Sequence, residues 1–252
     1  MKSFKEQPIN ILVPISGEGR RFKEAGFLEP KPLIKVLDKF MVQWGVGSCD
    51  FLNELTQHKL IFTVRKEHVD EFKIDQKLRE LFGSATIVIP IDTDNWPKGQ
   101  AGHALAAKEY INNNNRLFIY SCDTFSLSPS AELIDREDPD GILPCFEASE
   151  DRFSYAKLDQ DGYVCETAEK RVISNLATTG HYYFRRGSDF VDAVESMIKN
   201  KDTFNNEYYV APCYNFLIKR GKKLRVVMVK SNWVMGTPAE LEYFLEYYPD
   251  VN

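Results

Sequence analysis

A glycine-containing loop near the N-terminus has residues that could bind phosphate groups. It follows an apolar run over Ile9 to Pro14, which predicts a buried strand, and it reads Pro-Ile-Ser-Gly-Glu-Gly-Arg-Arg-Phe from Pro14 to Phe22. Gly17 and Gly19 would let the backbone approach phosphate oxygens. Arg21 could hold two phosphate oxygens at once. The loop is not a Walker A loop and lacks the third glycine of a dinucleotide fingerprint, and by itself it fits a plain tight turn equally well.

Two further residues could act on a phosphate. Lys31 stands between two prolines, which stiffen the backbone and fix where the ammonium group points. A lysine held in this way suits the stabilisation of charge during in-line phosphoryl transfer. Asp123 follows a strand-like run from Leu117 to Ser121, and a carboxylate at the end of a strand can hold Mg²⁺ against phosphates. The simpler interpretations are a solvated loop lysine and a helix-capping aspartate.

The elements that must position these residues alternate between strand and helix in the first half of the chain. Strands are predicted over 59–64 and 86–89, and helices over 67–82 and 100–111. This alternation is typical of an open α/β sheet, which binds ligands at the carboxyl ends of its strands. Gly17 and Asp123 each lie just past such an end.

The pattern changes in the second half. Residues 155–166 predict a β-hairpin around the turn Asp-Gln-Asp-Gly, and a last helix begins near Pro238. There is no internal repeat and no low-complexity linker. The sequence therefore predicts return elements of one domain rather than a second independent domain.

Composition excludes several classes of protein. The net charge of −5 over 252 residues disfavours a sequence-independent nucleic-acid binder, and no apolar run approaches the length of a membrane span. The polar N-terminus does not resemble a signal peptide, and the five cysteines form no CxxC pair. We expect a cytoplasmic protein without nucleic-acid or membrane partners, and the sequence leaves open whether it forms a homo-oligomer.

The loop from Gly17 to Phe22, followed by the Pro-Lys-Pro-Leu stretch at 30–33, resembles the signature of the sugar-phosphate nucleotidylyltransferase (NTP transferase) family. The similarity covers nearly all of the chain. In that family an arginine and a lysine bind the triphosphate and support attack on the α-phosphorus. The resemblance therefore implies catalytic roles for Arg21 and Lys31, and nucleotide binding by Gly17 and Gly19.

The same resemblance assigns roles further along the chain. Gly99 matches the glycine that approaches the nucleobase, and Asp123 matches the metal-binding aspartate, which contacts the nucleotide and makes Mg²⁺ the expected cofactor. Glu169 and Lys170 match the residues that contact the hydroxyls and the phosphate of the acceptor, and Asn175 is expected in the same pocket. Alone, Gly99 would fit an ordinary loop, and the Glu-Lys pair an ordinary surface.

One position departs from the family pattern. Many members carry a second metal-binding aspartate two residues before the glycine of a Gly-Thr-Pro segment, which here begins at Gly236. This chain has Val234 there, beside Trp233, and neither side chain can bind Mg²⁺. The metal would then rest on Asp123, phosphates and water, or on a carboxylate that the sequence does not identify.

The resemblance implies a Rossmann-like, three-layer α/β/α domain over 1–252 with a mixed, mainly parallel sheet. Residues 1–125 would bind the nucleotide, and 126–252 would supply an inserted β-hairpin acceptor region and a closing helix. The expected reaction transfers NMP from a pyrimidine NTP to a sugar phosphate or another small phosphorylated metabolite and releases pyrophosphate. CTP is slightly favoured over UTP and dTTP, because no glutamine precedes Pro97.

This activity would serve sugar-nucleotide synthesis, as for capsule or other cell-surface polysaccharides. Two alternatives stay open. One is a non-catalytic nucleotide-binding or regulatory homologue of the same fold, which Val234 favours. The other is a nucleotide-sugar glycosyltransferase, which Ser121-Cys122-Asp123 disfavours because the usual Asp-x-Asp motif is absent.

Overall fold

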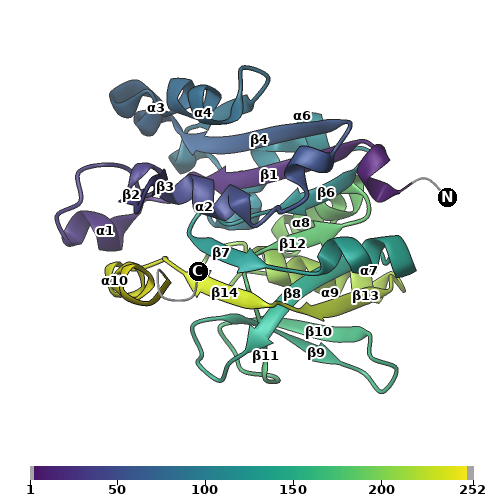
Figure 1. The fold of residues 1–252 in the computed structure, drawn as a ribbon. Coiled ribbons are helices and arrows are strands. Elements are labelled where there is room, and N and C mark those ends of the chain that lie inside the picture. The colour runs from purple at the N-terminus through teal and green to yellow at the C-terminus, as the bar shows by residue number, and fades with distance from the viewer. Residues whose placement is uncertain (1–2, 249–252) are drawn as a thin grey trace.

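A ten-stranded mixed sheet forms the centre of the computed structural model, which describes residues 3–248 (Figure 1). The strands are β1 (Ile9–Ile15), β2 (Lys35–Val36), β3 (Lys39–Phe40), β4 (His58–Arg65), β5 (Ile87–Ile91), β6 (Arg116–Ile119), β7 (Thr124–Leu127), β8 (Gly141–Glu147), β9 (Ser154–Leu158), β10 (Val164–Glu169), β11 (Leu176–Thr178), β12 (Tyr182–Phe184), β13 (Leu224–Met228) and β14 (Ser231–Val234). The α-helices are α1 (Arg20–Glu24), α2 (Met41–Gly47), α3 (Lys66–Phe72), α4 (Ile74–Phe82), α5 (Gln100–Ala104), α6 (Lys108–Ile111), α7 (Ser130–Glu137), α8 (Gly187–Asn200), α9 (Val210–Lys219) and α10 (Pro238–Tyr247).

The strand order in the large sheet is β10-β9-β11-β8-β12-β6-β1-β4-β5, and β13 pairs with β8. Strands β6, β1, β4 and β5 are parallel, and β12 joins them to the second half of the chain by antiparallel pairing with β6. The Rossmann-like α/β fold with a mixed sheet between helices is confirmed. One continuous sheet therefore carries elements from both halves of the sequence.

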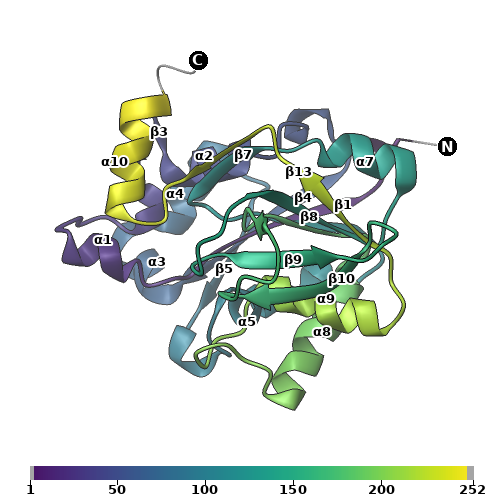
Figure 2. The same cartoon turned by 90° about the horizontal axis from the view of Figure 1, so that it is seen from below.

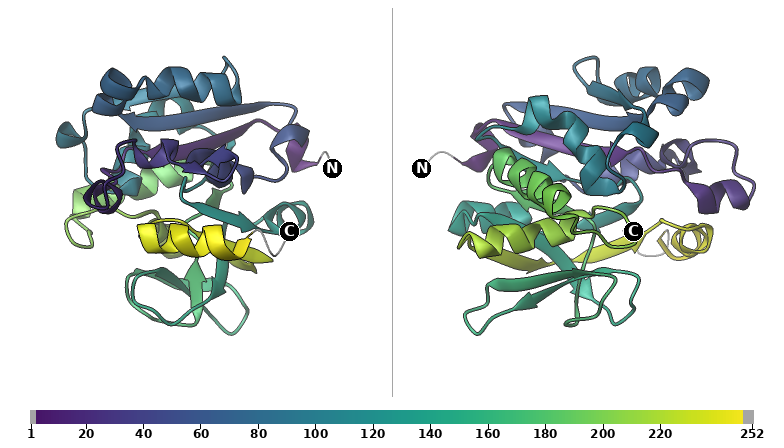
Figure 3. Two further views of the ribbon diagram at one scale, coloured as in Figure 1. Left: turned by 60° about the vertical axis from the view of Figure 1, so that its left-hand side comes forward. Right: turned by 180° about the vertical axis from the view of Figure 1, so that it is seen from behind.

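Helices cover both faces of the sheet because both faces are apolar. In β1, Leu12 belongs to the core cluster that α8 and α9 help to form, whereas Ile11 and Val13 belong to a second cluster with α2 and α4. Figure 3 shows α8 and α9 on the face seen from behind, and Figure 1 shows α2 and α7 on the opposite face. A strand buried on both sides reads as a continuous apolar run, which is why β1 is recognisable in the sequence.

Parallel pairing brings the ends of four strands to one edge. Ile15 of β1 lies beside Val64 of β4, and Arg65 lies beside Ile91 of β5. Leu12 lies beside Ile119 of β6. The segments that follow these four strands therefore leave the sheet on the same side, where open α/β sheets bind ligands.

The predicted hairpin of the second half is confirmed as β9 and β10, which pair antiparallel and lie side by side at the end of the sheet (Figure 2). In its turn, the Asp159 carboxylate accepts hydrogen bonds from the backbone N–H groups of Asp161 and Tyr163, at 3.0 and 2.8 Å. Gly162 adopts a positive φ of 77°, which a glycine tolerates without strain.

The prediction of one helix over 67–82 is wrong. Lys73 has a left-handed φ of 51° and its N–H caps α3, so that α3 and α4 are separate helices. Ile74 and Leu78 of α4 are fully buried in the core that contains β1 and β4. The helix predicted over 100–111 is likewise divided, into α5, a 3-10 turn and α6. Apolar periodicity did not reveal either interruption.

The C-terminal helix closes a third, smaller core. Leu241 and Phe244 of α10 pack with Trp44 of α2 and with Met235, which follows β14. Strand β14 pairs with β7, the strand that follows Asp123. The closing segment therefore reaches the edge of the sheet where the parallel strands end. Among residues 3–248, none of the helices combines the length and apolar character that crossing a membrane requires.

Candidate functional site

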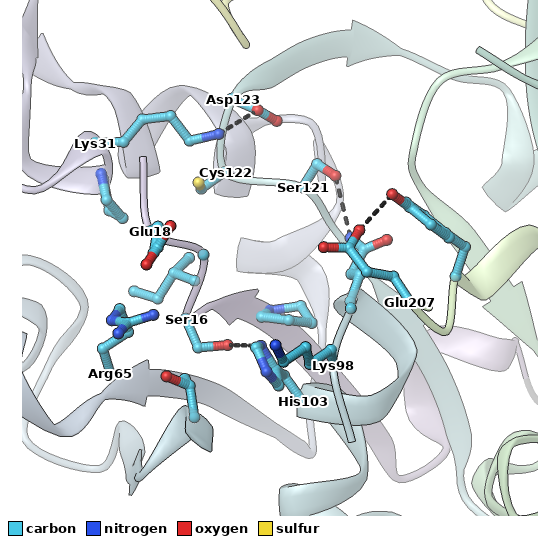
Figure 4. A pocket seen from close by; sticks show the side chains of 18 of the residues that line it. Ser16, Glu18, Lys31, Arg65, Lys98, His103, Ser121, Cys122, Asp123 and Glu207 are labelled. Carbon is cyan, nitrogen blue, oxygen red and sulfur yellow. Dashed lines mark hydrogen bonds and ion pairs between the residues drawn. The ribbon is translucent and has the colours of Figure 1, made fainter. Parts of the chain in front are cut away.

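A polar cavity of about 580 Å³ lies where the parallel strands end (Figure 4). Its wall is formed by Pro14, Ile15, Ser16, Gly17, Glu18, Lys31, Pro32, Arg65, Thr93, Asp94, Lys98, Gly99, Gln100, His103, Ser121, Cys122, Asp123, Glu207 and Tyr209. Four residues singled out from the sequence are among them: Gly17, Lys31, Gly99 and Asp123. We call this space the main cavity.

The glycine loop forms one side of the main cavity. Ser16 is buried, and its hydroxyl lies 2.8 Å from Nδ1 of His103 on α5, so the loop is tied to a helix. Gly19 has a left-handed φ of 65° and precedes α1. A Cβ at Gly19 would lie 3.4 Å from Cβ of Lys31, whereas one at Gly17 would meet nothing within 4 Å. Gly19 is therefore required by conformation, and Gly17 leaves the backbone open to the cavity.

Lys31 and Asp123 form an ion pair across the main cavity. Lys31 begins a 3-10 turn over Lys31–Leu33, and its Nζ donates to Oδ2 of Asp123 at 2.6 Å (Figure 4). Burial raises the pKa of Asp123, but the nearby ammonium group outweighs burial and holds that pKa below its ordinary value. Burial lowers the pKa of Lys31, and the carboxylate in turn raises it above the ordinary value. Both groups are charged at neutral pH.

The surroundings of Asp123 suit a small oxygen-binding cation. A Cβ at Gly236 would lie 3.2 Å from Oδ2 of Asp123 and 3.3 Å from Oε2 of Glu240, so the missing side chain leaves a space bordered by two carboxylate oxygens. Within residues 3–248, no three His, Cys, Asp or Glu side chains gather into a metal-binding group. Mg²⁺ often takes only one or two carboxylates and completes its coordination with phosphates and water. The residues present fit that requirement.

Gly99 is held by backbone packing as well as by its place in the cavity wall. Its φ is 95°, and a Cβ there would lie 2.5 Å from the carbonyl oxygen of Tyr208. Tyr208 donates its N–H to the carbonyl of Lys98 at 2.8 Å and accepts from the N–H of Ala101 at 3.0 Å. The absence of a side chain at Gly99 therefore lets two distant backbone segments pack together. This packing explains why a glycine stands here even if it contacts no nucleobase. Its contact with the base stays a prediction.

Glu169 opens onto a second cavity of about 170 Å³, which we call the side cavity. It is bordered by Gln100, Ser121, Thr124, Phe146, Arg152, Phe153, Ser154, Glu169, Thr178, Thr179, Gly180, Tyr182, Tyr209, Val210 and Val234. Gln100, Ser121 and Tyr209 border both cavities. Glu169 is buried and accepts a hydrogen bond from Ser154, and burial raises the pKa of this carboxyl group.

Lys170 lies behind the wall of the two cavities rather than in it. Its Nζ donates to the hydroxyl of Tyr209 at 3.0 Å and lies 4.7 Å from the centre of that ring. Tyr209 in turn donates to Glu207 at 2.5 Å. Lys170 is therefore one end of a hydrogen-bonded chain that reaches the main cavity through Tyr209 and Glu207.

Four predicted site residues lie outside both cavity walls: Gly19 and Lys170, described above, and Arg21 and Asn175. Arg21 is exposed at the start of α1, and Asn175 is exposed on the loop before β11, where only its carbonyl is used, to accept from the N–H of Ala148 at 3.2 Å. The structure thus does not bring Asn175 into the pocket where it was expected.

Sequence reasoning missed several residues of the main cavity. Arg65 ends β4 and Lys98 precedes Gly99, and both add positive charge to the wall. A cation directly after a predicted parallel strand was a usable signal for Arg65. Glu207 and Tyr209 carried no such signal, because the loop that holds them reaches the cavity only through tertiary packing. The combined wall offers cations for phosphates, and carboxylates and hydroxyls for sugar-like groups.

Comparison with known proteins places this geometry among nucleotidyltransferases. No protein-family model matches the sequence, and no curated protein matches it. A solved nucleoside-diphosphate-sugar pyrophosphorylase from Vibrio cholerae RC9 is 26% identical, with a TM-score of 0.79 over 93% of this chain and 99% of its own.

More distant structures share the fold. A UDP-glucose pyrophosphorylase complexed with UDP-glucose is 16% identical, with a TM-score of 0.73 over 96% of this chain and 99% of its own. The inositol-1-phosphate CTP transferase from T. maritima is 14% identical, with a TM-score of 0.70 over 94% and 96% of the two chains. The structural neighbours of this chain are nucleotide-sugar pyrophosphorylases and sugar-phosphate nucleotidyltransferases.

Proposed function

We propose that this protein transfers NMP from a pyrimidine NTP to a sugar phosphate or another small phosphorylated metabolite and releases pyrophosphate. The observation that carries the proposal is the main cavity, where the glycine loop, Lys31, Asp123 and Gly99 meet at the carboxyl edge of the sheet. The side cavity adjoins it and contains Glu169, so that donor and acceptor would bind next to each other.

The charged residues of the two cavities would have different roles, which depend on the sign of their charge. Lys31 would place a fixed positive charge beside the phosphates, which lowers the energy of the transition state as negative charge spreads over their oxygens. Arg65 and Lys98 would neutralise further phosphate charge. Asp123 would hold Mg²⁺, which supplies charge stabilisation as a Lewis acid when bound. Glu169 would accept hydrogen bonds from acceptor hydroxyls.

For the base we favour a pyrimidine, and CTP over UTP and dTTP. The segment around Gly99 is similar to that of pyrimidine-using members of the family, and Trp96 stands before Pro97 where many thymidylyl and uridylyl members have glutamine. Solved neighbours include one named for CTP and one bound to UDP-glucose. The fold accommodates either base.

A pyrophosphate-release screen tests this function. The four NTPs would each be mixed with a panel of sugar 1-phosphates and other phosphorylated acceptors in the presence of Mg²⁺. We expect release with one pyrimidine NTP and one class of acceptor, and its loss on adding EDTA. Tight NTP binding without release would instead favour a non-catalytic homologue. Turnover of nucleotide sugars without NTP would favour a glycosyltransferase.

A further inference from the structure

We propose that Glu240 supplies the second carboxylate of the metal site, in place of the aspartate that Val234 replaces. This inference rests on the proposed function, which requires a divalent cation beside Asp123. Glu240 lies on the first turn of α10, and its side chain is only 17% exposed. Its Oε2 and Oδ2 of Asp123 border the same space, which Gly236 leaves free by having no side chain.

The negative charge around this space is balanced by two cations. Asp123 pairs with Lys31 at 2.6 Å, and Glu240 pairs with Arg152. Lys31 lies in the wall of the main cavity and Arg152 in the wall of the side cavity. A divalent cation that binds between the two carboxylates would take the place of these two cations at the carboxylate oxygens. The two carboxylates carry two negative charges, which match one divalent cation.

Capping of α10 fixes the position of the Glu240 carboxylate, in a Thr-x-x-Glu pattern. The helix cap is made by Thr237, whose hydroxyl accepts the N–H of Glu240 at 3.2 Å. The Glu240 carboxylate accepts from that same hydroxyl at 3.0 Å through Oε2, and from Arg152 through Oε1. Oxygen Oε2 is therefore held by Thr237 at the edge of the space that Oδ2 of Asp123 also borders.

The place of Val234 agrees with this assignment. Its Cγ1 lies 3.8 Å from the point where a Cβ of Gly236 would stand, so its side chain borders the same space from the end of β14. An aspartate at 234 would reach the space that Glu240 already borders. In this chain the second carboxylate ligand would then come from α10 instead of β14.

The test measures binding of Mn²⁺ alone, by the loss of the electron paramagnetic resonance signal of free Mn²⁺ on adding protein. Glu240→Gln keeps size and hydrogen-bond acceptance but removes the charge, and we expect its Mn²⁺ affinity to fall on the order of tenfold or more. Glu242→Gln makes the same charge change at an exposed position of α10 and should bind as the wild type does. Adding Val234→Asp to Glu240→Gln should restore binding, which no purely structural role of Glu240 would explain.

Wild-type Mn²⁺ affinity in Glu240→Gln, or no Mn²⁺ binding by the wild-type protein, overturns the proposal. Should Glu240→Gln fail to fold, Arg152→Ala decides the matter: with its partner removed, Glu240 should bind Mn²⁺ more tightly, and equal or weaker binding overturns the assignment. The pyrophosphate screen separates this result from the function. If the wild type is active and Glu240→Gln binds Mn²⁺ as the wild type does, only the assignment of Glu240 is refuted. If the wild type is inactive and Mn²⁺ binding is lost in Glu240→Gln, only the proposed function is refuted.

Discussion

Replacing Lys31 by Met should separate stability from catalysis at the Lys31–Asp123 pair. Methionine keeps most of the length of the side chain but removes the charge, so Asp123 is left without its partner. At 2.6 Å the attraction between the two charges is roughly 6 kcal/mol for an effective dielectric constant of about 20. Desolvation of both groups cancels a large part of it.

The expected loss of stability follows from what remains buried. Removing one partner of a buried pair costs about 3–5 kcal/mol. The two side chains are 23% and 22% exposed, so water relieves some of that cost, and we expect the free energy of unfolding to fall by about 2–3 kcal/mol at pH 7. Asp123→Asn added to Lys31→Met should recover most of this loss, because no unpaired charge is then buried.

The pH dependence has a definite sign. Without Lys31, we expect burial, the largest influence on Asp123, to raise the pKa of this carboxyl group above its unfolded value. A carboxyl whose folded pKa is raised takes up a proton more readily in the folded state, so its cost to stability shrinks as the pH falls. The deficit of Lys31→Met should therefore be larger at pH 7 than at pH 5.

Urea unfolding at both pH values measures stability, and pyrophosphate release measures activity. Lys31→Met should lower kcat about 10²–10³-fold, and the double variant should stay as inactive although it is stable again. Lys35→Met, at an exposed position of β2, is the control and should change neither quantity. An equal stability loss at both pH values, or no rescue by Asp123→Asn, would refute the ion-pair reasoning. Full turnover in Lys31→Met would remove this lysine from the mechanism.

Three more changes test other parts of the site. Gly99→Ala should lower the melting temperature markedly, because its Cβ would lie 2.5 Å from a backbone oxygen. Gly17→Ala, whose Cβ would meet nothing within 4 Å, should shift the free energy of unfolding by less than about 0.5 kcal/mol, and equal effects of the two variants would contradict this contrast. Lys170→Ala should raise the acceptor KM and lower kcat/KM, because the hydrogen bond to Tyr209 is lost. Calorimetry should show a nearly unchanged affinity for NTP, and equal weakening toward both substrates would argue against this role of Lys170. Burial lowers the pKa of His68 to about 4, so between pH 6.5 and 4 the unfolded chain binds a proton that the folded chain does not. The free energy of unfolding should therefore fall by up to about 3 kcal/mol as the pH drops through this range. Urea unfolding of His68→Gln should show a smaller dependence on pH.

Strand direction explains how much of the site was predictable. An apolar run followed by Gly17, and another followed by Asp123, each predict a buried parallel strand with a functional residue at its carboxyl end. Parallel register then forces both residues to the same edge, as the pairing of β1 with β6 shows. No knowledge of the helices is needed for that step, so errors such as the unbroken helix over 67–82 did not affect it.

Loop conformation explains what was not predictable. Glu207 and Tyr209 follow Asn205 and Asn206, which adopt left-handed φ values of 50° and 60°. The loop then returns to pack its Tyr208 backbone against Gly99. Residues other than glycine give little sequence signal for such a turn, and the contact spans about half the chain. The place of these two residues in the main cavity therefore follows from tertiary packing alone.

The proposed metal site shows how a motif can be incomplete while the oxygens that a metal needs are present. A motif compares residue types at fixed positions, and by that measure Val234 removes a ligand. A cation instead requires oxygens around one space, whichever segment supplies them. Gly236 keeps that space open, β14 brings Val234 to one side of it, and α10 brings Glu240 to another. Because α10 packs on Trp44 through Phe244, the position of Glu240 is fixed by a core rather than by a mobile loop. A carboxylate held in this way can take over from a neighbouring strand without any change in the fold, and loss of the aspartate need not mean loss of the metal.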